Sequence, residues 1–131
     1  MKRVFATICA MGLASAAWAA DPVEGVWKTE VDDGRYAHVA IKACGAKICG
    51  VFQQTFDASG PVASDVIGKQ LLWDMNPEGG GKYSTDKSGR IWRPSNDKTY
   101  KSKMELKNAN TLIVQGCVGP ICPKQTWTRV K

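Results

Sequence analysis

The two ends of the chain downstream of residue 19 carry the strand patterns that most constrain the fold. A β-rich segment at 24–31 contains Trp27 two positions after a glycine, and the last such segment, at 125–130, contains Arg129. A small sheet loses its exposed edges only by closing on itself, so a first and a last strand of this kind are natural partners across a barrel seam. The Trp27 ring would then cover one mouth of the barrel, and the planar Arg129 guanidinium would lie on the indole while donating to nearby carbonyls.

This arrangement resembles the signature of the calycin superfamily, which includes lipocalins, fatty-acid-binding proteins and avidins. In that signature a Gly-x-Trp of the first strand, here Gly25 and Trp27, lies under an arginine of the last strand, here Arg129. The resemblance implies a single small antiparallel β-barrel in which Trp27 and Arg129 are structural residues.

Residues 1–19 have the three parts of a secretory signal peptide. A charged start precedes an apolar run at 4–13 and a small-residue ending, Ala17-Trp18-Ala19. This order predicts cleavage after Ala19 and export to the periplasm or secretion. An apolar run of about ten residues is too short to span a bilayer, so we expect no membrane span and one exported domain at 20–131.

The charge of the exported domain argues against a nucleic-acid partner. Removal of residues 1–19 takes away two of the 18 Lys and Arg residues, so 16 basic residues face 12 acidic ones and the net charge is +4 (16 − 12). The basic residues are spread along the chain, whereas a nucleic-acid site gathers them in one patch. We therefore expect a monomer with a solvated surface, and leave an anionic component of the cell envelope as an alternative partner.

Four cysteines of the domain form two Cys-x4-Cys pairs, Cys44 with Cys49 and Cys117 with Cys122. Each pair interrupts a β-rich segment, which is the layout of a hairpin. Cysteines opposite each other at the base of a four-residue loop reach disulfide distance in a non-hydrogen-bonded pair, where strands approach most closely. Spacing alone leaves all three connectivities open. We favour the two local disulfides, because each needs only its own hairpin.

The alternative interpretation of these cysteines as a metal or redox site is weak. Structural zinc sites combine closer cysteine spacing with further Cys or His ligands, and His38 is the sole histidine of the chain. Redox catalysis favours Cys-x-x-Cys, which neither pair has. We expect no metal and no cofactor.

The middle of the chain alternates short strands with turns. Strands are expected at 67–73, 89–92 and 99–106, and turn-rich segments lie at 57–64 and 76–81. A further hairpin turn is expected at Asp32-Asp33-Gly34-Arg35. In all we expect an all-β fold of seven or eight strands and no helix in the domain.

The segment 99–106 has the clearest two-residue period. Its mostly dry face carries Tyr100, Ser102, Met104 and Leu106, and Lys101, Lys103, Glu105 and Lys107 form the wet face. Such alternation is typical of a strand with one face on a core.

Six groups of residues together resemble domain-of-unknown-function family 2147, over essentially the whole domain. They are Gly25-Val-Trp27, Cys44 to Gly50, Ile67-Gly68 before Leu71-Leu72, Gly89-Arg-Ile91 with Pro94 and Tyr100, Leu112 to Cys117, and Trp127-Thr-Arg129. The family consists of small exported bacterial proteins without an established activity. The resemblance implies export and a compact β domain, and it supplies no catalytic residue.

The residues themselves also propose no catalytic site. We find no Ser, His and Asp arrangement with motif context and no Gly-rich loop that leads into a helix to hold phosphate. His38 is interpreted as a surface or rim residue of a strand. We therefore expect a protein that is not an enzyme, with a hydrolase-like activity as the weaker alternative.

Two functions are left open. The first is a barrel that binds a small apolar or lipid-like ligand of the envelope, and the second is a module that contacts another envelope protein or polymer through its loops and basic surface. The candidate ligand-binding residues are inward aromatic and apolar side chains, whose other interpretation is ordinary core: Trp73, Tyr83, Trp92, Tyr100 and Met104. A barrel of about eight strands lies at the boundary between an interior filled by side chains and one with room for a ligand.

Overall fold

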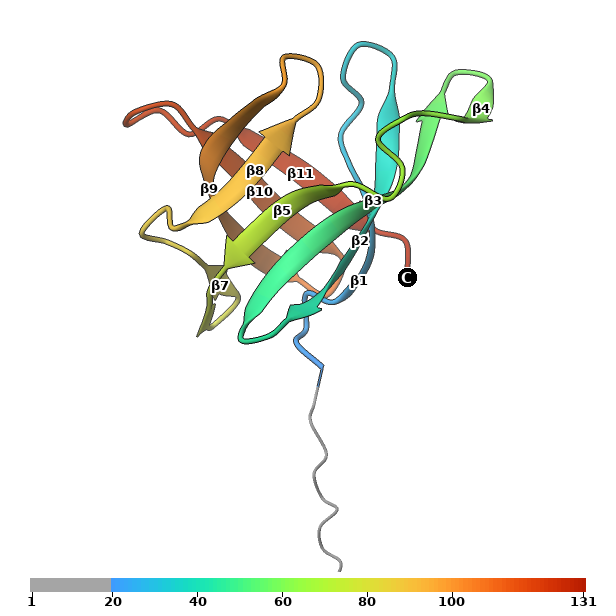
Figure 1. Ribbon diagram of the computed structural model, residues 1–131. Coiled ribbons are helices and arrows are strands. Elements are labelled where there is room, and N and C mark those ends of the chain that lie inside the picture. The colour runs from blue at the N-terminus through green and yellow to red at the C-terminus, as the bar shows by residue number, and fades with distance from the viewer. Residues whose placement is uncertain (1–19) are drawn as a thin grey trace, which may run out of the picture.

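A computed structural model, which describes residues 20–131, shows a closed antiparallel β-barrel (Figure 1). Each strand of the ring pairs with the next, and the pairings of β9 with β10 and of β11 with β1 complete the circle. The ring runs in the order β1 (Gly25–Lys28), β2 (Tyr36–Cys44), β3 (Lys47–Asp57), β5 (Gln70–Met75), β8 (Gly89–Arg93), β9 (Lys98–Asn108), β10 (Thr111–Cys117) and β11 (Lys124–Arg129). The all-β barrel of eight strands is thus confirmed, with no helix in the described part of the chain. The predicted signal peptide lies outside the described residues.

Three short strands lie outside the ring. β4 (Gly60–Val62) folds back on the end of β3, and β6 (Pro77–Gly79) pairs with β7 (Lys82–Tyr83), which pairs with β9. The sequence predicted turns at 57–64 and 76–81, and this was wrong for β4 and β6, which lie within those segments. Gly80 and Gly81 have φ of 64° and 80°, the positive values of a two-residue hairpin turn, so the glycines that suggested a loop make a hairpin.

Two strand boundaries also differ from the prediction. β1 ends at Lys28 and not at Val31, and the hairpin turn at 32–35 follows as expected, with a bridge between Asp32 and Arg35. β5 begins at Gln70 and not at residue 67. Gly68, with φ of 89°, lies in a turn there, because that backbone conformation does not fit a strand.

The core fills the barrel around Trp27, Trp127, Leu72, Met75 and Leu112, each less than 2% exposed. On β9 the side chains alternate as predicted, with Ser102 and Met104 buried and Lys101 and Lys107 exposed. Glycines on the inner wall leave room for large neighbours: a Cβ at Gly89 would collide with the sulfur of Met75, and one at Gly50 would lie 3.1 Å from Cγ1 of Val39. The interior at this level is therefore packed with side chains.

Both cysteine pairs form local disulfides, which confirms the favoured connectivity. In the second hairpin Val118 and Ile121 exchange two backbone hydrogen bonds, so Cys117 and Cys122 form the next, non-hydrogen-bonded pair, with Cα atoms 4.1 Å apart. The directly opposite pair was predicted, but the turn holds two residues, Gly119 and Pro120, and not the expected four.

The first hairpin has a different geometry from the one predicted. Its turn holds two residues, Gly45 and Ala46, and Cys44 lies opposite Lys47. The disulfide therefore links Cys44 diagonally to Cys49, with Cα atoms 5.8 Å apart. The expected four-residue loop was wrong here, since Gly45, with φ of 64°, permits a tighter turn.

Candidate ligand site at the barrel mouth

One end of the barrel is closed by Trp27. Its ring is fully buried, and its Nε1–H donates to the carbonyl of Val23, 2.9 Å away, which is itself fully buried. The Arg129 guanidinium lies over the ring, with Cζ 4.4 Å from the ring centroid. It also donates to the carbonyls of Glu24 at 2.9 Å, Pro22 at 2.6 Å and Ala109 at 2.5 Å. One arginine thus joins the segment before β1, the turn after β9 and the last strand.

This contact explains the glycine of the Gly-x-Trp pattern. Gly25 has φ of 142°, and a Cβ there would lie 2.5 Å from Nη1 of Arg129 and 2.5 Å from the carbonyl oxygen of Lys131. Any side chain at this position would displace the guanidinium from Trp27. Glycine, tryptophan and arginine therefore form one structural unit.

Tyr83 ties the segment before β1 to the rest of the closed end. Its hydroxyl donates to the carboxylate of Asp21, and the tyrosine is 3% exposed. Burial raises the pKa of Tyr83 far above its ordinary value, and the neighbouring Asp21 carboxylate raises it further. The tyrosine is therefore a neutral hydrogen-bond donor across the physiological range.

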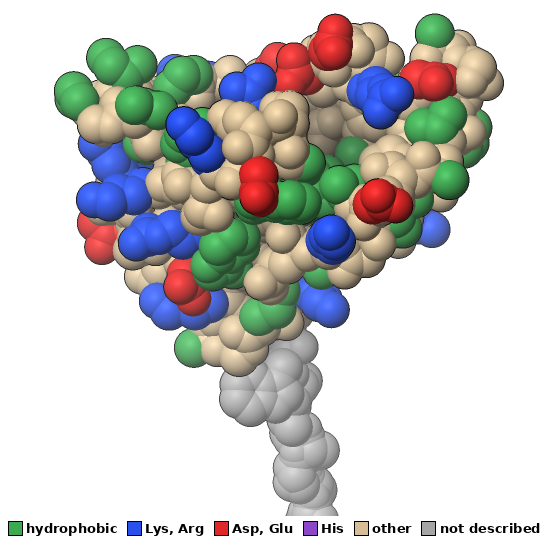
Figure 2. All heavy atoms as spheres, turned by 45° about the horizontal axis from the view of Figure 1, so that its top comes forward, with side chains coloured by type: hydrophobic (Ala, Val, Ile, Leu, Met, Phe, Trp, Pro, Cys, Tyr) green, Lys and Arg blue, Asp and Glu red, His purple; other side chains and the backbone are tan. Residues whose placement is uncertain are grey.

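The opposite end of the barrel is open. The loops after β1, β8 and β10 surround it, whereas the N-terminal residues and the turns after β2 and β9 lie at the Trp27 end (Figure 1). A hollow of about 400 Å³ lies at this mouth, with Tyr100, Val114 and Gly116 on its walls. In Figure 2, where this end comes forward, the surface between the loops is recessed.

The walls of the hollow follow from strand register. Met104 pairs with Val114 and Ser102 with Gly116, so the dry face of β9 and the even-numbered residues of β10 share the barrel interior. Glycine at 116 makes room for Ile91, because a Cβ there would lie 3.2 Å from Cγ2 of that residue.

Charged residues of both signs form the rim of the hollow. Arg93 lies 3.5 Å from the carboxylate of Asp32, linking the end of β8 to the turn after β1. Glu30 accepts the backbone N–H of Thr126 at 2.5 Å, and Lys124 completes the rim. Because the side chains of Arg93 and Asp32 are 55% and 67% exposed, their ion pair contributes little to stability. The arrangement offers an apolar wall with polar groups above it.

A second hollow of about 500 Å³ lies beside the first. Lys87, Lys101 and the tip of the β10–β11 hairpin line it, together with Tyr100 and Val118. Tyr100 and Val118 line both hollows and therefore separate them.

Of the five candidate ligand residues, Tyr100 alone lines these hollows. Tyr83 and Met104 are buried in the filled part of the barrel, 3% and 2% exposed. Trp73 and Trp92 are half-buried, and the Trp92 ring packs edge-on against Phe52 with centroids 6.4 Å apart. The structure does not bring the five together.

The sequence analysis missed the wall and rim residues Val114, Gly116, Val118 and Arg93. The alternation along β10 was a usable signal, because Leu112, Val114 and Gly116 lie two residues apart. It became informative only once the register between β9 and β10 was known.

His38 lies in an aromatic group on the outer wall. Its ring centroid is 4.5 Å from that of Phe56, which stacks on Tyr36 at 4.8 Å, and Lys28 lies 4.6 Å from the Tyr36 ring centroid. Partial burial lowers the pKa of His38, and the positive charge of Lys28 lowers it further. Across residues 20–131 no group of three or more His, Cys, Asp or Glu residues could hold a metal ion.

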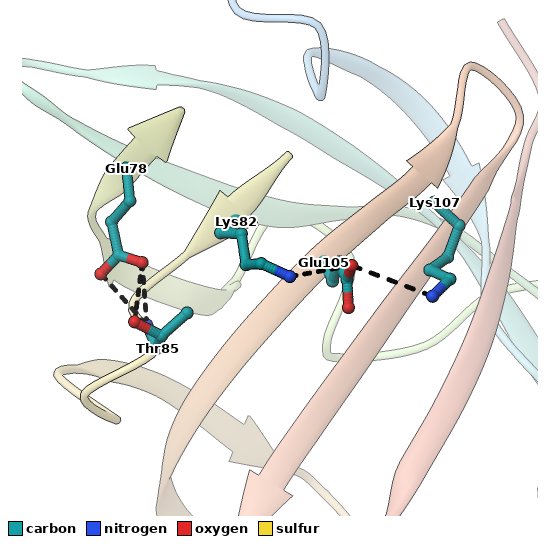
Figure 3. A network of polar contacts seen from close by, with 5 residues as sticks. All are labelled: Glu78, Lys82, Thr85, Glu105 and Lys107. Carbon is teal, nitrogen blue, oxygen red and sulfur yellow. Dashed lines mark hydrogen bonds and ion pairs between the residues drawn. The ribbon is translucent and has the colours of Figure 1, made fainter. Parts of the chain in front are cut away.

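A network of polar contacts joins the β6–β7 hairpin to β9 away from the mouth (Figure 3). Lys82 lies 3.1 Å and Lys107 3.8 Å from the carboxylate of Glu105, and Thr85 donates to Glu78 through both its hydroxyl and its backbone N–H. The hydrogen bond from Lys82, followed by the charge of Lys107, lowers the pKa of Glu105. These exposed groups satisfy one another and hold the hairpin in place.

Comparisons with known proteins agree with the family resemblance and with the barrel fold. A family model described as "Uncharacterized protein conserved in bacteria" (DUF2147) matches residues 25–129. A solved structure of protein HP1028 from Helicobacter pylori, described as belonging to the lipocalin family, matches with a TM-score of 0.68 at 17% identity and covers 83% of each chain. At that identity the likeness concerns the fold alone. No curated protein matches significantly, and no helix in the described part of the chain is long and apolar enough to cross a membrane.

Proposed function

The chain belongs to the bacterial family DUF2147, and from this premise and the barrel geometry we propose that it is a non-catalytic protein that binds a small, apolar or lipid-like ligand at the open mouth. One observation carries the proposal: a hollow of about 400 Å³ with Tyr100 and Val114 on its walls and charged residues on its rim. Ligand sites are typically concave and mostly apolar, with a few polar groups that fix orientation.

The filled lower barrel limits what the hollow can take. Leu72, Met75 and Trp127 are less than 2% exposed, so a long acyl chain has no room to run toward Trp27. The fitting ligand has a short or compact apolar end that packs against Tyr100 and a polar end that reaches the rim. Arg93 and Lys124 would receive an anionic polar end, and Glu30 a cationic one.

The chemistry of the mouth supports binding without catalysis. Its acidic residues serve as partners of other groups, Asp32 of Arg93 and Glu30 of the Thr126 backbone. His38, on the outer wall, packs against Phe56. A general acid or base must lie within hydrogen-bond reach of the reacting group. We assign the rim carboxylates, which already make these contacts, to holding the polar end of the ligand and not to proton transfer.

We further infer that the protein works in an oxidising compartment, the periplasm or the extracellular space. Two local disulfides support this, since such bonds persist where thiols are not kept reduced. The signal peptide predicted at 1–19 agrees with it.

The second candidate function is an interaction module that contacts an envelope protein or polymer through its loops and basic surface. It is favoured by the exposed aliphatic residues Val118 and Ile121 beside the mouth, 63% and 65% exposed.

A titration of delipidated protein with a fluorescently labelled short-chain fatty acid, whose short apolar end fits the hollow, separates the two candidates. We expect saturable binding that weakens at least tenfold in Tyr100→Ala, because the wall of the hollow is lost. Tyr36→Ala is the matched control, since Tyr36 is also half-buried but stacks on Phe56 outside the hollow. Native mass spectrometry of protein purified from its own compartment would show a retained ligand as added mass. Absence of binding by any apolar probe, or equal loss in both variants, would contradict the ligand site.

A further inference from the structure

The tip of the β10–β11 hairpin is an exposed aliphatic surface on a rigid support. Val118 and Ile121 are 63% and 65% exposed, and the disulfide between Cys117 and Cys122 lies directly behind them. Gly119 has φ of 57° and the ring of Pro120 fixes the next φ near −65°, a combination typical of a tight type II′ turn. The tip therefore needs little ordering when it meets a partner.

Most backbone N–H groups of this tip are already paired. The N–H of Val118 donates to the carbonyl of Ile121 at 2.8 Å, and the N–H of Ile121 donates back at 3.1 Å. Pro120 has no N–H, so Gly119 carries the one remaining donor of the turn. A segment that enters a lipid interface must leave few backbone groups without partners, and this tip meets that requirement.

Basic residues flank the aliphatic tip. Lys101 pairs in register with Cys117, Lys124 begins β11 two residues after Cys122, and Lys87 lines the same hollow as Val118. Acidic residues are also present: Asp32, paired with Arg93, and Glu30, bonded to the Thr126 backbone, line the mouth, and Asp86 precedes Lys87. Figure 2 shows hydrophobic side chains over this hairpin with Lys and Arg side chains below them.

We propose that this hairpin docks the protein on the surface of an anionic phospholipid bilayer, with Val118 and Ile121 in the interface and the three lysines at the lipid phosphates. Adjacent aliphatic and basic side chains fit this partner, because the aliphatic groups enter the boundary between headgroups and acyl chains and the lysines pair with the anionic headgroups. Val118 also lines the mouth, so docking brings the hollow to the membrane surface. The inference goes beyond ligand binding and does not require it.

The test is flotation of oxidised, delipidated protein with vesicles of phosphatidylglycerol and phosphatidylcholine, compared with pure phosphatidylcholine. We expect binding to the anionic vesicles that weakens in high salt. The double variant Val118→Asp/Ile121→Asp should bind at least tenfold more weakly, and Lys101→Glu/Lys124→Glu at least about thirtyfold more weakly. The matched controls are Val130→Asp, at another exposed valine, and Lys42→Glu, on an exposed lysine of β2, and both should bind as wild type.

A reporter variant gives a second, independent measurement. In Ile121→Trp the indole replaces an exposed aliphatic side chain, so the fold is retained. Residues 20–131 already hold four tryptophans, so the signal is the difference spectrum between variant and wild type, which should shift to the blue with anionic vesicles. No shift, or tip variants that bind as Val130→Asp does, would overturn the proposal. Loss of binding in the lysine variant alone would show that the protein only adsorbs to the vesicles through its basic residues, without insertion of the hairpin tip. Binding of an envelope protein by the tip without binding to vesicles would assign the surface to a protein partner instead.

Discussion

Replacing Trp27 by alanine should remove most of the stability of the barrel. The ring is fully buried, its N–H is bonded to the buried Val23 carbonyl, and Arg129 lies on its face. Truncating a buried tryptophan costs about 3–5 kcal/mol, out of a total of about 5–15 kcal/mol for a domain. At about 4 °C per kcal/mol for a domain of this size, the melting temperature should fall by about 12–20 °C.

One further variant isolates the contribution of the Trp27 hydrogen bond to this loss of stability, and a second serves as the control. Trp27→Phe keeps an aromatic ring but leaves the Val23 carbonyl without its donor, which costs about 1–3 kcal/mol. Trp73→Ala is the control, because Trp73 is only half-buried and should lose less. Chemical denaturation and circular-dichroism melts of the three variants give the comparison. If Trp27→Ala melted within a few degrees of wild type, or no lower than Trp73→Ala, the ring would not close the barrel and the closure argument would fail.

Three other perturbations test the closed end and the hairpin. Gly25→Ala should displace the Arg129 guanidinium and lower the unfolding free energy, read by denaturation, while alanine at the open turn position Gly34 should leave Arg129 in place. Because the folded-state pKa of Tyr83 is raised, the stability that Tyr83 contributes is fully present below its unfolded pKa of about 10 and is lost as the pH rises above it. Tyr83→Phe should therefore reduce the loss of stability at alkaline pH. In the same variant, tyrosinate absorbance should show one fewer tyrosine that resists ionisation. Replacing Cys117 and Cys122 together by serine should lower the unfolding free energy by about 2 kcal/mol, through the short loop that the disulfide closes, and denaturation should show a lower midpoint. An unchanged midpoint would mean that the disulfide orders only the hairpin tip and does not stabilise the fold.

The closure of the barrel was predictable because its determinants are few and unusual. Gly25, Trp27 and Arg129 form one unit, in which the glycine admits the guanidinium and the guanidinium covers the indole. Each of the three residue types is needed for a physical reason, so the pattern survives in the sequence. The alternation on β9 was equally readable, because burial on one face has a period of two residues.

The turns were less predictable, because glycine marks both a loop and a tight hairpin. Gly80-Gly81 and Gly45 each adopt positive φ and reverse the chain within two residues. The sequence shows that the chain can turn at these glycines, but the strands that flank the turn decide how many residues it holds. For the same reason one cysteine pair took the predicted directly opposite geometry and the other a diagonal one.

The ligand site was the hardest feature to predict, because it depends on which end of the barrel is filled. Met104 and Tyr100 share the dry face of β9, yet Met104 is 2% exposed in the core and Tyr100 lines the mouth. Four residues along a strand span about 13 Å, which is the difference between a packed layer and an open one. A substitution such as Met104→Lys would therefore bury an unpaired charge and report on stability, not on ligand affinity. At Tyr100 a substitution should affect ligand affinity more than stability. Its half-buried ring borders the hollow, and its hydroxyl accepts a hydrogen bond from Asn96, 2.8 Å away on the exposed loop.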